Sequence, residues 1–211
     1  MDRVKEMWAF NLPCLLMVNG GKAYWTTKVK PIYKVLYKDI LLNVRKSLAA
    51  SLIEVAKLID LKDDPPDSED HLFMVEVANH LLSDVDEVRL KLLPHLCEFV
   101  SLFPTDNQQM LLHTMIKERL DNEKGSKMKD LCAKMLEQLF EMFPANELVD
   151  GEFHQYLFKA IKSESIIGVR KRMAYVLGNK VVARLIKQKK YRKDLTDYVD
   201  ELRLSKNFRD R

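Results

Sequence analysis

The 211-residue sequence contains little glycine, little proline and little cysteine. Six glycines and seven prolines supply few of the tight turns that closely spaced β-strands require, so the composition favours helices. Cys14, Cys97 and Cys132 share no short spacing, and no Asn-x-Ser/Thr acceptor occurs. These absences argue against a disulfide framework and against a glycosylated ectodomain. We therefore expect a reducing compartment, with the cytoplasm as the location.

The sequence also lacks an apolar run long enough to cross a membrane. The longest run, residues 7–18, contains Asn11 and Pro13 and falls short of the ~20 residues that a spanning helix needs. A signal peptide is the weaker interpretation, because Asp2 and Glu6 lie where a signal peptide is cationic. The 35 Lys and Arg nearly balance the 31 Asp and Glu, so composition does not favour non-specific binding to nucleic acid.

What the sequence does contain is a long internal repeat. An apolar residue followed by a basic one recurs at intervals of 40, 44, 40, 41 and 39 residues. The pairs are Val4-Lys5, Val44-Arg45, Val88-Arg89, Met128-Lys129, Val169-Arg170 and Phe208-Arg209. Phe103-Pro104 and Phe143-Pro144 follow two of these pairs at the same distance, and proline ends a helix. The repeated units therefore end at the same distance from their apolar-basic pairs.

Each apolar-basic pair opens an amphipathic helix of about sixteen residues. In the first complete unit the apolar positions are Val44, Leu48, Leu52, Val55 and Ile59, which is helical spacing. A second helical pattern precedes each such helix, over residues 29–38, 72–82, 108–120 and 153–161. A short polar turn separates the two patterns, so the repeated unit is a helical hairpin.

The turn inside each hairpin has its own signature. An acid lies four or five residues before four of the apolar-basic pairs, at Asp39, Asp84, Glu123 and Glu164. Asn43, Asp86 and Ser126 lie one or two residues before the pair, where a side-chain oxygen is expected to cap a helix start. The turn acids have two compatible interpretations. The favoured one makes them helix caps and acceptors for basic residues of a neighbouring repeat, and the other makes them contacts for a partner.

One hairpin of ~40 residues cannot bury its own apolar face, so copies must stack on each other. We predict an all-α fold, an α-solenoid of stacked hairpins that forms one continuous array over residues 1–211. Complete units are expected at about 26–60, 70–104, 105–145 and 151–187, partial units at 1–25 and 191–211, and an acidic loop insertion at 60–71. Because both partial units hold one helix, we expect a segment of a longer protein or a truncated form.

A period near 40 residues, two helices, an acid in the turn and Val-Arg at the second helix resemble the HEAT repeat over nearly the whole chain. Two segments are similar to regulatory and scaffold subunits of the type-2A family of serine/threonine phosphatases, VRKSLAASLIEVAKLI and LLSDVDEVRLKLLPHLCEFVSLFP. A third segment is similar to the regulatory subunits of protein phosphatase 4, FNLPCLLMVNGGKAYW.

The resemblance implies a non-catalytic subunit that binds a type-2A-family catalytic subunit and modulates its targeting or activity. In scaffold members of the family the turns hold the catalytic subunit, and by position those turns are 39–43, 83–87, 122–126 and 163–168. The resemblance assigns partner binding to Asp39, Asn43, Asp84, Asp86, Glu87, Glu123 and Glu164, and a ladder of basic residues to Arg45, Arg89, Lys129 and Arg170. Glu123 and Glu164 in place of Asp, and Met128-Lys129 in place of Val-Arg, depart from the family pattern.

No catalytic residue, cofactor or metal site is expected, and neither is a small-molecule substrate or a membrane partner. The histidines, at positions 71, 80, 95, 113 and 154, include no pair at the i, i+4 spacing of a helical metal site. The Gly-Ser-Lys at 125–127 follows no strand and lacks the order of a phosphate-binding loop. Cys97 and Cys132 lie in apolar stripes, where cysteine behaves as a small buried hydrophobe. We therefore expect that the protein is not an enzyme.

Basic residues cluster near the C-terminus, at Lys187, Lys189, Lys190, Arg192 and Lys193. A solvated loop between repeats is the favoured interpretation, and a nuclear localisation signal is the alternative. The same cluster supports a rival function, a HEAT-repeat adaptor for other cargo of the importin kind or for nucleic acid. Its confinement to one end of the chain argues against nucleic acid as the partner. A purely structural spacer is the third class.

Three further features carry open alternatives. Trp25 lies between units and is either a core residue, which is favoured, or an aromatic anchor for a partner. Trp8 falls in the apolar stripe of the first helix, so we expect it in the core. The acidic insertion is expected to be a solvated loop, in which Ser68, followed by Glu69 and Asp70, is a candidate for phosphorylation.

Overall fold

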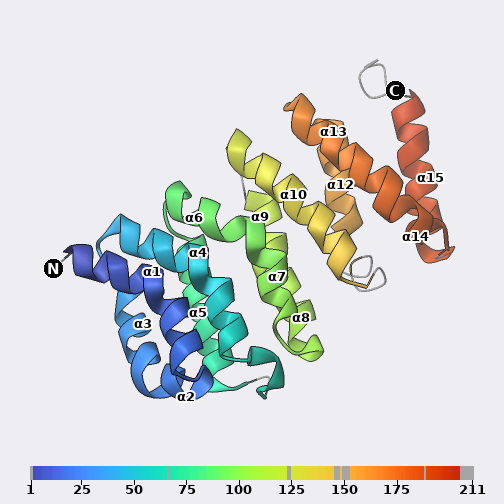
Figure 1. The fold of residues 1–211 in the computed structure, drawn as a ribbon. Coiled ribbons are helices and arrows are strands. Elements are labelled where there is room, and N and C mark those ends of the chain that lie inside the picture. The colour runs from blue at the N-terminus through green and yellow to red at the C-terminus, as the bar shows by residue number, and fades with distance from the viewer. Residues whose placement is uncertain are drawn as a thin grey trace. The chain divides into compact units, whose positions relative to one another are not determined.

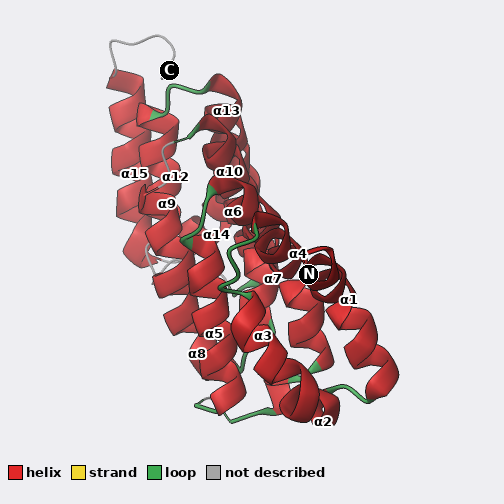
Figure 2. Ribbon diagram, turned by 90° about the vertical axis from the view of Figure 1, so that its left-hand side faces the viewer, coloured by secondary structure: helices red, strands yellow, loops and turns green. Residues whose placement is uncertain are grey.

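The computed structural model describes residues 2–65, 67–122, 125–144, 148, 153–187 and 189–204. Every regular element in these ranges is a helix, and turns join the helices (Figure 2). This confirms the all-α prediction for the described residues. The chain divides into two compact units, Met1–Met115 and Ile116–Arg211. None of the described helices is both long and apolar enough to cross a membrane.

The first unit holds two layers of helices. One layer contains α1 (Asp2–Asn19), α4 (Leu42–Leu58) and α6 (Asp86–Leu92), with α4 in contact with both of the others (Figure 1). The other contains α3 (Lys30–Leu36) and α5 (Glu69–Leu82). The remaining elements are α2 (Lys22–Tyr24), η1 (Trp25–Val29), η2 (Leu61–Asp63), η3 (Leu93–His95), α7 (Leu96–Ser101) and α8 (Thr105–Leu111).

The predicted apolar positions form the core of this unit. Val44, Leu48, Leu52 and Val55 of α4 are all fully buried, as their helical spacing requires. On α1, the buried residues are Ala9, Leu12 and Leu16, and α1 packs against α4. Trp8 is 41% exposed, so the prediction that it belongs to the core is wrong.

Two glycines make the sharp connection that follows α1. Gly20 and Gly21 both adopt positive φ angles, 97° and 58°, which L side chains rarely take. A Cβ atom on Gly21 would also lie 3.0 Å from the carbonyl oxygen of Leu58. The close approach of α1 to the end of α4 therefore depends on glycine at this position.

The second unit contains the remaining helices. They are α9 (Glu118–Asn122), α10 (Ser126–Met142), α12 (Phe153–Ser163), α13 (Ile167–Val176), η5 (Leu177–Val181), α14 (Val182–Lys187) and α15 (Lys189–Leu204). A π-helical segment, η4 (Leu112–Lys117), lies between α8 and α9 in the chain. Within the unit, α10 and α12 both pack against α13, and α15 packs against α14. Its core includes Met128, Met135 and Leu139 of α10, which recur at helical spacing.

The helix boundaries agree with the sequence pattern to about three residues, but the predicted caps are wrong. Asn43, Asp86 and Ser126 lie inside the first turns, because the helices begin at Leu42, Asp86 and Ser126. The residues at the N-cap positions are Leu41, Val85 and Gly125, and none makes a side-chain cap. The turn acid caps the helix start instead, because its carboxylate accepts the backbone N–H of a residue one or two positions later. Those bonds join Leu41 N to Asp39 (3.0 Å), Val85 N to Asp84 (2.7 Å) and Ile166 N to Glu164 (2.9 Å).

The acidic insertion is solvated only in part. Lys62, Asp63 and Asp67 are exposed, whereas Leu61 is buried. The Ser68 side chain accepts the N–H of His71 at 3.2 Å and so caps α5. Pro66 lies outside the described residues. The expectation of a solvated loop is therefore wrong for Leu61, Asp70 and His71, which are buried.

Asp70, the last acid of the insertion, belongs to a buried polar cluster with Trp25 and Lys30. The indole Nε1 of Trp25 donates to Asp70 Oδ1 at 2.9 Å, and Lys30 Nζ donates to the same oxygen at 2.6 Å. Burial opposes ionisation of Asp70, but these two donors outweigh it and hold the pKa of its carboxyl below the ordinary value. Trp25 is fully buried, as the favoured interpretation predicts.

We expect Asp70→Ala to lower the free energy of unfolding by about 3 kcal/mol, because it leaves the buried Lys30 ammonium without its closest acceptor. Glu69→Ala is the matched control. Glu69 also pairs with Lys30, at 3.0 Å, but its side chain is 78% exposed, so solvent screens the pair and the expected loss is much smaller than that of Asp70→Ala. Urea unfolding followed by far-UV circular dichroism measures both, and equal losses would contradict the buried role of Asp70.

Candidate functional site

Three turns of the hairpins share one kind of inter-hairpin ion pair. In each, a basic residue near the start of one helix reaches the acid in the turn of the following hairpin. The pairs are Lys5 Nζ to Asp39 Oδ2 at 2.7 Å, Arg45 Nε to Asp84 Oδ2 at 2.5 Å, and Lys129 Nζ to Glu164 Oε2 at 2.9 Å. We call these three pairs the turn ladder. The first two lie in the first unit and the third lies in the second unit.

Arg45 is the most highly connected member of the turn ladder. Its Nη2 donates to the second carboxylate oxygen of Asp84 at 3.1 Å, so the pair is bidentate. Its Nη1 donates to the backbone carbonyls of Asp39 at 2.7 Å and Ile40 at 3.1 Å. One guanidinium therefore ties the turn of its own hairpin to the turn of the next, which the single ammonium of a lysine cannot reproduce.

The ladder acids are held in their ionised form. The hydrogen bond from Arg45 is the main cause that lowers the pKa of Asp84. The Lys5 ammonium, together with the N–H of Leu41, lowers the pKa of Asp39. Burial acts to raise the pKa of Glu164, but the N–H of Ile166 and the Lys129 ammonium outweigh it, and the net shift is downward. The turn ladder is thus a set of charged pairs at neutral pH.

The turn ladder leaves its carboxylates little access to solvent. The side chains of Asp39, Asp84 and Glu164 are 3%, 10% and 9% exposed. Of the other residues predicted to bind a partner, Asn43, Asp86 and Glu87 are exposed, and Glu123 lies outside the described residues. The structure therefore separates the predicted set into inner acids that are nearly sealed from solvent and outer polar residues that are exposed, of which Asn43 donates to Glu6 Oε1 at 3.1 Å.

Two exposed apolar residues lie in the same turns and were not predicted from the sequence. Ile40 is 88% exposed and Val85 is 49% exposed, and each directly follows a ladder acid. The available signal was their position, since each is an apolar residue in a turn that the sequence predicts to be polar. Together with Asp86 and Glu87 they form what we call the turn surface of the first unit.

Of the other predicted residues, Arg89 adjoins the turn surface, whereas Arg170 and the basic cluster lie in the second unit. Arg89 Nη1 lies 3.1 Å from Asp86 Oδ1, and Arg170 is half-buried near the start of α13. In the basic cluster, Lys187, Arg192 and Lys193 are exposed, while the side chains of Lys189 and Lys190 lie outside the description. Trp25 is sealed inside the core of the first unit and is not part of any surface.

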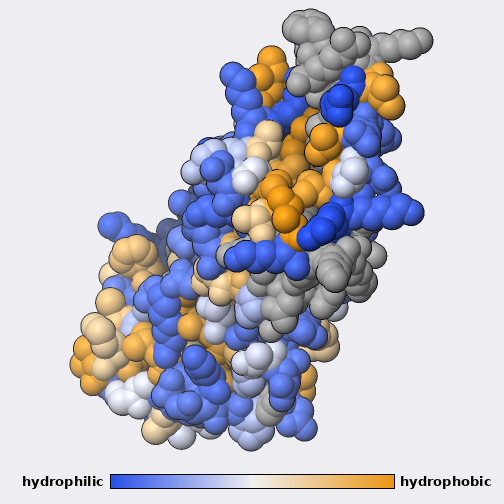
Figure 3. Space-filling model, turned by 90° about the vertical axis from the view of Figure 1, so that its right-hand side faces the viewer, coloured by the Kyte–Doolittle hydropathy of each residue, from blue (hydrophilic) through white to orange (hydrophobic). Residues whose placement is uncertain are grey.

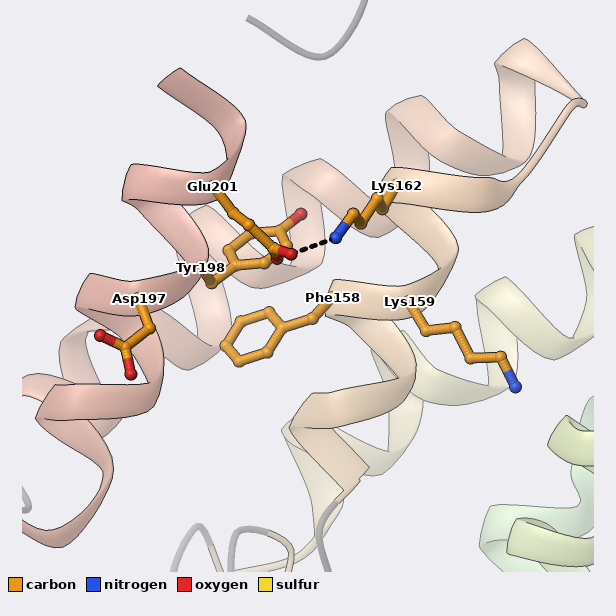
Figure 4. A pocket seen from close by; sticks show the side chains of 6 residues that line it. All are labelled: Phe158, Lys159, Lys162, Asp197, Tyr198 and Glu201. Atoms are coloured by element: carbon orange, nitrogen blue, oxygen red, sulfur yellow. Dashed lines mark hydrogen bonds and ion pairs between the residues drawn. The ribbon is translucent and has the colours of Figure 1, made fainter. Parts of the chain in front are cut away.

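The second unit has a hollow of about 600 Å³ between α12 and α15 (Figure 4). Phe158 and Tyr198 stack inside it with ring centroids 4.3 Å apart, and Lys162 pairs with Glu201 at its rim. The described residues hold no group of three or more His, Cys, Asp or Glu suited to a metal ion. Figure 3 shows hydrophobic side chains gathered on the face where α14 and α15 lie. The exposed large apolar residues of these two helices include Ile186, Val199 and Leu204.

A double-mutant cycle on Arg45→Ala and Asp84→Ala tests the turn ladder. We expect a coupling energy of about 1–3 kcal/mol, because both side chains are mostly buried and the pair is bidentate. Additive losses in the free energy of unfolding would contradict a direct interaction.

The pair of Arg45 and Asp84 also makes the stability of the fold depend on pH, and the lowered pKa of Asp84 sets the direction of that dependence. Since Asp84 has a lower pKa in the folded chain than in the unfolded chain, its contribution is complete above about pH 4 and is lost as the pH falls through the folded pKa. The stability difference between the wild type and Asp84→Asn should therefore shrink between pH 7 and about pH 3. Urea unfolding at each pH measures it, and a difference that stays constant would contradict the shift.

Comparisons with known proteins give one kind of relative. No protein-family model matches the chain, and no solved structure matches it. Serine/threonine-protein phosphatase 4 regulatory subunit 1 from Homo sapiens, from Mus musculus and from Rattus norvegicus is 28% identical over 144 residues. The match covers 67% of this chain but 14% of each relative, so the chain spans a small part of their length.

Among the regulatory subunits of protein phosphatase 4, the segment FNLPCLLMVNGGKAYW favours regulatory subunit 4. The matching relatives are regulatory subunit 1, so the more specific expectation has no support among them. What the comparisons establish is a distant relationship between this chain and a regulatory subunit of protein phosphatase 4.

Proposed function

We propose that this chain is an array of HEAT-type hairpins that acts as a non-catalytic regulatory or scaffold subunit. It binds the catalytic subunit of a type-2A-family serine/threonine phosphatase similar to protein phosphatase 4 and modulates the targeting or activity of that enzyme. The observation that carries the proposal is the turn ladder, whose first two pairs join residues 34 and 39 positions apart. The distant relationship to a phosphatase regulatory subunit supports the choice of partner.

The turn ladder suits such a role because it fixes the turns without occupying their outer side. Its carboxylates are directed to the neighbouring hairpin and are nearly sealed from solvent. A partner would therefore meet Ile40, Val85, Asp86 and Glu87, two apolar and two acidic side chains on a backbone held in place beforehand. Preorganisation of this kind lowers the entropic cost of association.

The cysteines support a binding role better than a catalytic one. Burial raises the pKa of the Cys97 thiol to about 12, so this residue remains a protonated thiol at neutral pH. Cys132 is also buried, and Cys14 is exposed on a helix that offers it no neighbouring base in the lining of its hollow. A nucleophilic cysteine needs the opposite environment, with a lowered pKa and an adjacent base.

The test is a binding measurement between the full chain and a purified protein phosphatase 4 catalytic subunit. We expect the double variant Ile40→Glu/Val85→Glu to bind at least tenfold more weakly, since it places two charges in the apolar part of the turn surface. The matched control is Val35→Glu/Leu72→Glu, which changes two residues of α3 and α5 that are 65% and 64% exposed. Biolayer interferometry gives the dissociation constants, and the control is expected to stay within twofold.

Charge reversal of the ladder acids is unsuitable here, because Asp84→Lys would break the bond to Arg45 and lower stability. Circular dichroism must show that each variant is folded before its binding is compared. If the folded wild-type chain fails to bind the catalytic subunit, the proposed function is wrong. If the control weakens binding as much as the turn variant, the contact lies elsewhere on the chain.

A further inference from the structure

Helix α1 is apolar on two opposite faces. Ala9, Leu12 and Leu16 form the face that is buried in the first unit. The opposite face, which we call the α1 stripe, consists of Val4, Met7, Trp8, Asn11, Cys14, Leu15 and Val18. The stripe carries no charged residue, although 31% of the chain is charged. Six of its residues, with Asn19, line a hollow of about 450 Å³.

A helix that is hydrophobic all round is normally covered on both sides. The repeat shows this directly, because Val44, Leu48 and Val55 of α4 occupy the register positions of Val4, Trp8 and Leu15 on α1. The three α4 residues are fully buried. Val4 and Trp8 are 57% and 41% exposed. The α1 stripe is thus the kind of surface that a further helix covers elsewhere in this unit.

The order of residues in the α1 stripe is self-complementary. Its successive spacings are 3, 1, 3, 3, 1 and 3 residues, which read the same in both directions from Asn11. If two copies of α1 lie antiparallel across a two-fold axis at Asn11, the axis pairs Val4 with Val18, Met7 with Leu15 and Trp8 with Cys14. Trp8, the largest side chain of the α1 stripe, then meets Cys14, the smallest. The apolar contact extends over about 21 Å of helix.

Polar groups agree with the same arrangement. Asn11 donates one N–H to the carbonyl of Met7 at 2.7 Å, and its second N–H and its amide oxygen suit a reciprocal pair with Asn11 of another copy. Helix α1 has no basic residue in its last turn. Antiparallel docking brings the exposed Arg3 of one copy to the C-terminal carbonyls of α1 in the other, where a positive charge is favourable.

We propose that the α1 stripe is a self-association surface, on which α1 of one copy packs antiparallel on α1 of a second copy about a two-fold axis at Asn11. The docked helix continues the layer of α1, α4 and α6, each of which packs on the next. A contact made by one helix from each copy is at the small end of specific interfaces, so the dimer is concentration-dependent. The proposal is independent of the proposed function, since it uses no residue of the turn surface.

Sedimentation equilibrium over a range of concentrations tests the association. The wild type is expected to interconvert between monomer and dimer, and Trp8→Glu is expected to lower the association constant at least tenfold by placing a charge in the centre of the contact. The matched control is Met17→Glu, because Met17 lies on the same helix at 65% exposure but outside the α1 stripe. Its association constant should stay within twofold. Circular dichroism confirms that each variant is folded.

Disulfide trapping tests the orientation. In a Cys14→Ser background, Asn11→Cys places two thiols at the axis and should give a covalent dimer under mild oxidation. Asn19→Cys places the two thiols about 24 Å apart along the helices, beyond disulfide reach, and should give none. Cys97 and Cys132 are buried and do not compete.

Three results would overturn the proposal. The first is a wild-type chain that stays monomeric at every concentration, whatever else covers the α1 stripe. The second is equal weakening by Trp8→Glu and Met17→Glu, which would move the contact off the stripe. The third is equal trapping by Asn11→Cys and Asn19→Cys, which would indicate a parallel pair. Loss of phosphatase binding in the turn variants would leave the proposal untouched.

Discussion

The bidentate contact between Arg45 and Asp84 is the constraint on which the first unit depends most. Apolar burial drives the helices together, but burial alone tolerates sliding of one helix along another. The guanidinium fixes the register, because it must reach Asp84 and two backbone carbonyls of the preceding turn at once. Lys5 with Asp39 repeats this constraint one hairpin earlier, and Lys129 with Glu164 repeats it in the second unit.

Asp39 and Asp84 are already paired with Lys5 and Arg45, and this pairing changes the surface that a partner would meet. A row of free carboxylates would attract any cationic protein over a long range, with little specificity and strong dependence on salt. Paired carboxylates have no such field. Recognition through Ile40 and Val85 would instead require contact and shape, since apolar side chains act only over short distances. The flanking acids Asp86 and Glu87 would then adjust the approach of the partner and would not dominate it.

Local patterns were enough to predict the helices and their ends. The spacing of Val44, Leu48 and Leu52, and the proline after Phe103, act within one hairpin and need no knowledge of the rest of the chain. Burial at Asp70 was not predictable in this way, because its partners Trp25 and Lys30 lie 45 and 40 residues upstream. The exposure of Trp8 was missed for the same physical reason, since it depends on whether another helix covers α1.

The span of the long-range polar contacts also bears on how the chain folds. Those in the first unit join residues 34 to 45 positions apart, which is one hairpin and its turn. Loop closure over such a distance has a moderate entropic cost, and no contact of this kind waits for distant parts of the chain. A nascent chain leaving the ribosome would therefore be able to secure each hairpin on the one before it, so the face that each hairpin packs on its predecessor would be exposed only briefly.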